Sequence, residues 1–284
     1  MYDKLVAKLT AERFAVYGLE IRQDGKFLFS WHPAPDIRYP VYSATKSVTS
    51  LAAGLAVAEG KFSVDAPLSE YLPQEYLARM EPEKRAAFLP LPVRRFLTMS
   101  VPGYPFRPEG EDWLQFSLSC PIEAGKTGFA YSNIPAYLVG AAVERAVGEK
   151  MGDYLLPRLF IPLGIKNPVL QTDPQGRFYG ATGMQLTVGE LARIGEVYRT
   201  GGCFDGKRLL PESWIKEAVS CQIANREGGY GYFIWVQENS FSISGKWGQK
   251  CILYPEMGLS VSWLGNMPED SRRMENTVRA FLEG

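Results

Sequence analysis

The chain has 284 residues, 46% of them hydrophobic and 22% charged, which is enough to bury a full core in one large domain or two lobes. Thirty-one basic residues balance 31 acidic ones, so no basic field is available to attract nucleic acid or an anionic membrane. We therefore expect neither partner, and no stretch reaches the ~20 apolar residues of a membrane span.

The cysteines predict neither a zinc site nor a disulfide framework. Cys120, Cys203, Cys221 and Cys251 are far apart, form no CxxC pair, and are accompanied by a single histidine, His32. Reduced thiols are typical of a cytosolic protein. Residues 1–8 lack the apolar region of a signal peptide, and we expect a complete, cytoplasmic protein.

Residues 15–60 predict a β-hairpin followed by a helix. Residues 15–22 alternate in polarity, Asp24-Gly25 is a strong two-residue turn signal, and residues 26–31 form the returning strand. Residues 44–59 carry an apolar stripe among many small residues, and Gly60 is placed to end this helix. Its small side chains indicate a helix packed closely on several sides.

The rest of the chain predicts helices first and strands afterwards. Residues 61–180 are expected to be mostly helices and loops. The predicted elements are a helix from Pro135 to about Val147, a helix opened by the capping box Thr187–Glu190 and ending near Gly201, a helix over 211–219, strands over 230–236, 250–254 and 259–264, and a last helix over about 270–282.

This order predicts an α+β fold with an antiparallel sheet flanked by helices. Strands near both chain ends would share the sheet, so residues 1–60 and about 181–284 would form one α/β lobe. Residues from about 61 to 180 would form an inserted all-helical lobe of the same single domain. A junction between two lobes is a common location for a ligand site.

Ser43-Ala44-Thr45-Lys46 begins the predicted helix 44–59 and places a hydroxyl and an amine one turn apart on one face. Serine needs an adjacent base to act as a nucleophile. His32 lies in a loop-like stretch, so the base would be Lys46. Burial and the positive end of the helix dipole both favour an uncharged lysine. Taken alone, the pattern is better explained by a capping serine and a solvated lysine, because SxxK occurs often by chance.

Two further features could serve the same chemistry. Tyr131-Ser132-Asn133 precedes the Pro135 helix, where a phenol could relay a proton and an amide could orient a carbonyl. Lys246-Trp247-Gly248-Gln249 leads into the strand at 250–254, and its glycine would allow close approach of a ligand. The alternative interpretations are a packed turn tyrosine with an asparagine cap, and a hairpin turn with an exposed lysine.

SxxK, YxN and Lys-x-Gly in this order resemble the penicillin-recognising serine enzymes, in the branch of class C β-lactamases, D-peptidases and related esterases. The resemblance extends over nearly the whole chain. It also includes residues 56–73, 95–100, 162–164 and 209–214. The resemblance implies a β-lactamase-like fold and acyl transfer without a metal or organic cofactor.

For individual residues, the resemblance implies that Ser43 attacks a carbonyl while Lys46, with Tyr131, takes its proton. Tyr131 would then protonate the leaving group and help activate water. Backbone N–H groups of Ser43 and of the strand near Gln249 would hold the oxyanion. The substrate-binding residues would be Asn133, Lys246, Trp247, Gly248 and Gln249.

The third motif departs from the family pattern, because Trp247 stands where threonine is usual. In another register Ser242 to Ser244 would occupy the motif and Lys246 would lie beyond it. A small ester or amide is the expected substrate, hydrolysed by an esterase, a D-aminopeptidase or a β-lactamase-like amidase. The alternative is a non-catalytic or slowly acylated sensor on the same fold, and the sequence leaves the oligomeric state open.

Overall fold

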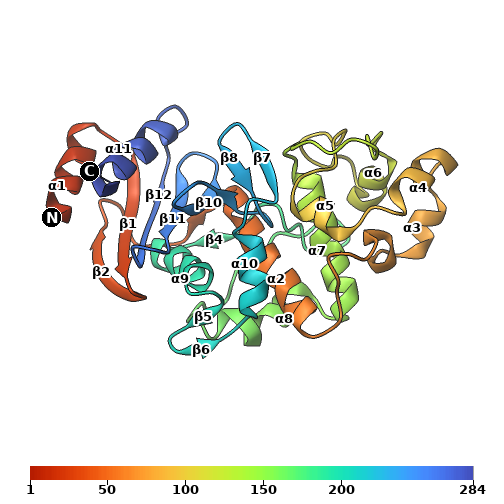
Figure 1. Ribbon diagram of the computed structural model, residues 1–284, viewed down its shortest axis with the longest axis horizontal. Helices are drawn as coiled ribbons and strands as arrows, with labels where there is room; N and C mark the ends of the chain where they lie inside the picture. Colours follow the sequence, from red (N-terminus) through yellow and green to blue (C-terminus); the bar gives the residue numbers. More distant parts are fainter. Residues whose placement is uncertain (284) are drawn as a thin grey trace.

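The computed structural model describes residues 1–283, which are built around an eight-stranded antiparallel sheet (Figure 1). The strand order is β2-β1-β12-β11-β10-β9-β8-β7. The strands are β1 (Val16–Gln23), β2 (Lys26–Trp31), β7 (Ile223–Asn225), β8 (Gly228–Tyr230), β9 (Trp235–Val236), β10 (Phe241–Gly245), β11 (Gln249–Tyr254) and β12 (Leu259–Gly265). Short pairs join β3 (Tyr39–Pro40) to β4 (Gln185–Leu186) and β5 (Cys203–Phe204) to β6 (Lys207–Arg208).

The two ends of the chain meet in this sheet, as the sequence predicts. β1 pairs with β12, so that Leu19 lies opposite Trp263. The β1–β2 hairpin turns at Asp24 and Gly25, with φ angles of 50° and 79°. Positive φ at both positions is what a two-residue hairpin turn requires.

Helices cover both faces of the sheet. α9 (Val188–Arg199) lies on one face, where Gly195 lets the helix approach Cys251 of β11 closely. α1 (Tyr2–Ala11) and α11 (Ser271–Glu283) cover the other face, in a cluster that includes Leu5, Ile252 and Met274. Successive strand residues point to opposite faces, so Cys251 and Ile252 serve different layers.

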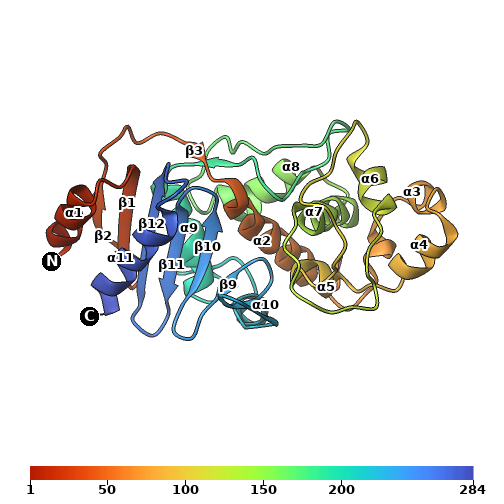
Figure 2. The ribbon, with the colours of Figure 1, turned by 90° about the horizontal axis from the view of Figure 1, so that it is seen from above.

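The helical part of the chain lies beside the sheet. Figures 1 and 2 show α3, α4 and α6 at the end of the molecule opposite β1 and β2. The helices of this part are α3 (Gln74–Ala78), α4 (Pro82–Phe88), α5 (Val93–Leu97), α6 (Trp113–Ser119), α7 (Asn133–Val147) and α8 (Met151–Leu155), with a 3₁₀ turn over Leu68–Tyr71 and a π-helical turn over Leu156–Phe160.

α2 (Thr45–Ala58) is the central helix, and every residue from Thr45 to Ala56 is buried. It packs against α7 and against α10 (Glu212–Ala218). Gly54 shows why small residues are needed, because a Cβ there would lie 2.5 Å from the Trp214 ring. The predicted end at Gly60 is confirmed by its left-handed φ of 69°.

The predicted α+β architecture is confirmed, with local differences that include the unpredicted short strands β3 to β7. The strand expected over 230–236 is two short strands, β8 and β9, separated by a turn in which Phe233 has a φ of 63°. β10 and α1 were not predicted. The capping box of α9 is present as expected, with Thr187 and Glu190 bonding each other's backbone. None of the helices within residues 1–283 has the length and apolar character needed to cross a bilayer.

Candidate active site

Ser43 lies in a 3₁₀ turn, Tyr42–Ala44, that leads directly into α2. The turn is held where Val41 N–H donates to the Met184 carbonyl at 3.0 Å, and Tyr42 has a φ of 47°. The N-cap of α2 is Ala44 and makes no side-chain cap. The Ser43 hydroxyl is therefore not used as a helix cap, which was the simplest alternative to a nucleophile.

Lys46 is buried, with 1% of its surface exposed, and its amine meets three oxygen atoms. Nζ lies 2.7 Å from Asn133 Oδ1, 2.9 Å from the Ala181 carbonyl and 3.2 Å from Ser43 Oγ. The Ala181 segment is held to α2 by Thr49, whose hydroxyl donates to the Gly180 carbonyl at 2.7 Å. Burial lowers the pKa of Lys46 to about 7.

These contacts orient the neutral form of Lys46. An uncharged amine has two N–H groups and one lone pair. The two oxygens that can only accept, those of Asn133 and Ala181, are also the nearer ones and take the two N–H groups. The lone pair is then left for the Ser43 hydroxyl, which can donate. In its neutral form, the amine could therefore accept the serine proton.

Tyr131 lies beside the amine, with Nζ of Lys46 5.0 Å from the ring centroid. Burial raises the pKa of Tyr131 to about 12, although its hydrogen bond with Ser43 acts in the opposite direction. The phenol is therefore protonated at neutral pH, and Lys46 is the stronger candidate for the base. The Tyr131 ring stacks on Trp235 at 5.8 Å, which fixes its position against β9.

Asn133 is the first residue of α7, but the cap of that helix is Ser132, whose hydroxyl accepts from Ile134 N–H. The Asn133 amide is free to bridge: Oδ1 accepts from Lys46, and Nδ2 donates to the Tyr179 hydroxyl at 3.2 Å. Sequence reasoning did not identify Tyr179. No spacing rule connects it to α7, and its role depends on the folded contact.

A cavity of about 600 Å³ opens in front of the nucleophile. Its lining includes Ser43, Asn133, Tyr179 and Lys246. Four of the predicted site residues, Ser43, Lys46, Tyr131 and Asn133, lie together, and the Lys246 side chain reaches the same cavity from the β10–β11 turn.

The other residues of the third motif lie elsewhere. The Trp247 ring packs edge-on against the Tyr42 ring, with 5.2 Å between the two ring centroids. Gln249 uses its side chain to bond the backbone of Gly265, donating at 2.6 Å and accepting at 3.2 Å. Gly248, with a φ of 90°, packs against Met267. None of these three residues lines the Ser43 cavity, although the sequence predicts that they contact the substrate.

The strand beside the nucleophile is β10 rather than β11. A Cβ on Gly245, the last residue of β10, would lie 2.1 Å from the Val41 carbonyl, so only glycine fits against the Ser43 turn. β9 pairs with β10 only at Phe241 and Ser242, which leaves the end of β10 to this turn. The alternative register, Ser242 to Ser244, ends directly before this glycine, but neither serine lines the Ser43 cavity.

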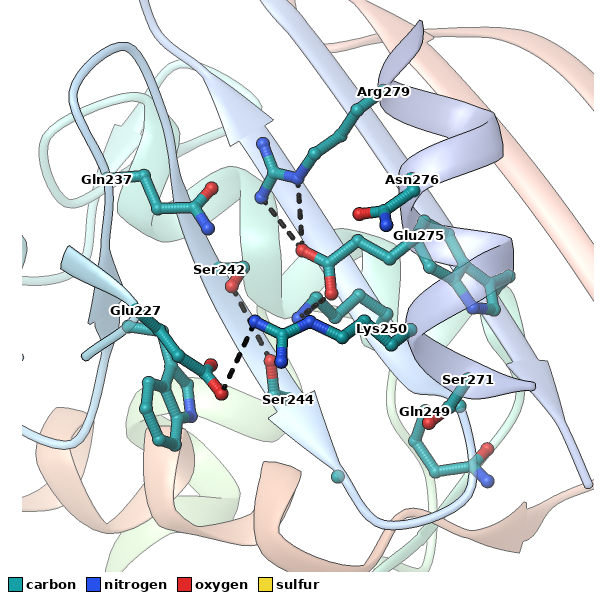
Figure 3. A pocket seen from close by; sticks show the side chains of 15 residues that line it. Glu227, Gln237, Ser242, Ser244, Gln249, Lys250, Ser271, Glu275, Asn276 and Arg279 are labelled. Atoms are coloured by element: carbon teal, nitrogen blue, oxygen red, sulfur yellow. Dashed lines mark hydrogen bonds and ion pairs between the residues drawn. The ribbon is translucent and has the colours of Figure 1, made fainter. Parts of the chain in front are cut away.

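A second, smaller cavity of about 270 Å³ lies between β10, β11 and α11 (Figure 3). Glu275 reaches from α11 toward the sheet. Its Oε2 lies 2.6 Å from Lys250 Nζ, and its Oε1 lies 3.0 Å from Arg279 Nη2. Burial acts to raise the pKa of Glu275, but the two cations outweigh it and lower that pKa. Gly248 and Gln249 line this cavity and not the one at Ser43.

His32 lies away from these groups. Its ring packs against Gly18 of β1, and Nδ1 is 3.8 Å from Asp36. This placement agrees with the interpretation of His32 as a loop residue.

Comparison with known proteins gives consistent matches. The sequence model of the β-lactamase family matches residues 3–283. The 6-aminohexanoate-dimer hydrolase of Paenarthrobacter ureafaciens is 23% identical over 205 residues, which cover 66% of this chain and 52% of the relative. The chain thus spans about half the length of that curated relative.

Solved structures show the same fold at low identity. A Bacteroides dorei protein provisionally assigned as a β-lactamase has a TM-score of 0.79 at 17% identity, covering 99% of this chain and 98% of that one. A Bacillus anthracis protein provisionally assigned as a 6-aminohexanoate-dimer hydrolase has a TM-score of 0.77 at 15% identity, with coverages of 97% and 82%. The β-lactamase-like fold implied by the sequence is confirmed.

Proposed function

Because the chain belongs to the β-lactamase family, we propose that it is a serine hydrolase that cleaves a small ester or amide through an acyl-enzyme on Ser43. The observation that carries the proposal is the buried Lys46 amine, whose pKa burial lowers to about 7 and whose Nζ lies 3.2 Å from Ser43 Oγ. A sensor that only binds its ligand has no need of an activated nucleophile.

In the first step, the Ser43 proton passes to Lys46 as Oγ attacks the substrate carbonyl. Backbone N–H groups of Ser43 and of the chain at the end of β10 would stabilise the oxyanion, since Gly245 brings that strand against the Ser43 turn. Tyr131, protonated at neutral pH, gives its proton to the leaving group and is reprotonated from Lys46. Water then attacks the ester formed on Ser43 while Lys46 accepts its proton. The bond between the acyl carbon and Oγ breaks, the acid is released, and Lys46 returns the proton to Oγ.

The names of the relatives support an amide as one substrate class. A 6-aminohexanoate dimer is a linear amide, and two similar proteins carry that substrate in their names. Esters could react at the same site more readily than amides, because an alcohol is a better leaving group than an amine. A panel of linear esters, linear amides and a β-lactam separates the three preferences.

Labelling with a fluorophosphonate, followed by mass spectrometry of the intact protein and its peptides, tests the proposal. We expect one adduct on Ser43, turnover of at least one panel substrate, and loss of both in Ser43→Ala. Ser119→Ala, on the exposed face of α6, is the matched control and should behave as the parent does. Ligand binding without any Ser43 adduct would favour the sensor, and turnover by Ser43→Ala would reject the mechanism.

A further inference from the structure

Two cations line the Ser43 cavity without a charged partner. Arg107 and Lys246 both contribute to its wall, and neither makes an ion pair or a side-chain hydrogen bond within residues 1–283. Most other basic side chains near the sheet are paired, as Lys250 is with Glu275. Unpaired cations at the mouth of a cleft attract an anionic ligand.

Both cations are attached to backbone that touches the catalytic groups. Arg107 follows Phe106, whose carbonyl accepts from the Asn133 N–H at 2.8 Å. Lys246 follows Gly245, which abuts the Ser43 turn, and its ammonium lies 4.3 Å from the Trp247 ring centroid. The two charges are thus placed by the same segments that place the nucleophile and the amide.

Tyr179 supplies a third donor to this cavity. It is 4% exposed, and its oxygen accepts from Asn133 Nδ2, so its own proton can be donated to a ligand. Arg107 lies close enough for its charge to counteract the rise that burial causes in the pKa of Tyr179. A phenol O–H beside a guanidinium is suited to a carboxylate oxygen.

Glu109 is the one carboxylate that lines the cavity among the described residues. It reduces the local excess of positive charge but does not cancel it, because Arg107 and Lys246 together outnumber it. The cavity therefore favours a single negative charge on its ligand over an ammonium group. Both cations are exposed, so each contributes modestly and less at high salt.

Under the proposed mechanism, the cavity would hold the acyl side of the scissile bond. Under the proposed mechanism the leaving group must lie at Tyr131, which packs with Phe129 and Trp235. The described lining of the cavity contains Asn133 and Tyr179 but not Tyr131. A ligand group in this cavity would therefore remain on the enzyme when the leaving group departs.

We propose that this cavity binds a carboxylate carried by the acyl part of the substrate, held by Arg107, Lys246 and the Tyr179 hydroxyl. The preferred substrates are then monoesters or monoamides of linear dicarboxylic acids. This inference rests on the proposed function. It assigns a specificity that is absent from the catalytic motifs themselves.

The test compares 4-nitrophenyl hydrogen adipate with 4-nitrophenyl hexanoate, which share chain length and leaving group. We expect the adipate ester to have the higher kcat/KM, by about tenfold or more at low salt. Arg107→Gln and Lys246→Gln should each lower the ratio of the two kcat/KM values about fivefold to tenfold, and Glu109→Gln should raise it. Using the ratio removes any general loss that affects both esters.

Lys216→Gln, an exposed cation on α10, is the matched control and should change neither rate. An adipate-to-hexanoate ratio near one, or a higher kcat/KM for 4-nitrophenyl 6-aminohexanoate, would overturn the inference while leaving a Ser43-dependent hydrolase. If neither ester is hydrolysed, calorimetry of adipate and hexanoate binding to Ser43→Ala decides: selective adipate binding that Arg107→Gln abolishes supports the site, and equal binding rejects it.

Discussion

At the scale of the residue, the proposed chemistry depends on one buried amine. Lys46 has no carboxylate partner within residues 1–283 and is surrounded by oxygens of Ser43, Asn133 and Ala181. The cost of desolvating an ammonium outweighs what these neutral acceptors return, so the pKa falls to about 7. A lysine with this pKa could act as a base near neutral pH, so the proposed mechanism does not need a histidine.

The pH dependence of kcat/KM follows from this pKa. Lys46 must be neutral to accept a proton, so activity with 4-nitrophenyl hexanoate should rise tenfold per pH unit below pH 7 and level off above it. Tyr131, with a pKa of about 12, should cause no decline up to about pH 10. A rising limb centred near pH 10 would mean that Lys46 is an ordinary, charged lysine. Stability at each pH, followed by circular dichroism, is the control.

The sequence predicts the residues whose signal lies in short spacing. Ser43 and Lys46 are one helical turn apart, and Tyr131 and Asn133 flank a helix cap, so their patterns can be read locally. Tyr179 and Gly245 carry no such pattern. Their importance lies in a contact with Asn133 in one case and with Val41 in the other, which only the folded chain creates.

At the scale of the element, the position of β10 decides the shape of the site. The strand ends at Gly245 against the Ser43 turn, while the following turn, with Trp247 at a φ of 64°, carries Lys246 into the cavity. β10 was not predicted, although Phe241 to Ser244 alternates in polarity, because the run is only five residues long and ends in a glycine. Its two serines face the polar cavity under α11, where a hydrophobic pattern is not required (Figure 3).

Gly245→Ala tests the close approach of β10 to the nucleophile. The added Cβ would lie 2.1 Å from the Val41 carbonyl, so the Ser43 turn or the strand must shift. We expect kcat/KM to fall about a hundredfold and the free energy of unfolding to fall by about 1–3 kcal/mol. Gly125→Ala, where a Cβ meets nothing within 4 Å, is the control. A variant with parental activity would show that β10 does not position the site.

Other differences between expectation and structure have the same kind of cause. The segment 230–236 has the composition of a strand, but Phe233 adopts a left-handed φ that breaks it into β8 and β9. α1 buries only Leu5 and Leu9 and has no side-chain cap, so its helical signal is weak. Its stability comes from packing beside α11 and not from propensity.

At the scale of the whole molecule, a half-buried ionic cluster joins α11 to the sheet. Lys250 of β11 and Arg279 share the carboxylate of Glu275 (Figure 3). Burial lowers the pKa of Lys250 even though Glu275 acts to raise it, which shows that the ammonium depends on this partner. These ion pairs hold α11 against β11 beside the apolar contacts that the same helix makes with the sheet.

Glu275→Gln should lower the free energy of unfolding by about 3 kcal/mol, because it leaves the Lys250 charge buried without a carboxylate. Urea denaturation at pH 7 measures the loss, and Glu256→Gln, in the exposed β11–β12 turn, should change it little.

The loss should depend on pH in one direction. The pKa of Glu275 is lower in the folded state than its ordinary value of 4.5, so its contribution is present above pH 4.5 and disappears as the pH falls through the folded pKa. The difference between parent and variant should therefore shrink in acid. An equal difference at pH 7 and pH 3, or no difference at pH 7, would contradict this account.

Pairing of β1 with β12 has a consequence for biosynthesis. The hairpin at residues 16–31 leaves the ribosome early, but the neighbour that completes its inner edge is made only when residues 259–265 emerge. Until then a nascent chain holds its nucleophile without the strand layer that shapes it. Synthesis itself would thus delay assembly of the site until β12 has emerged.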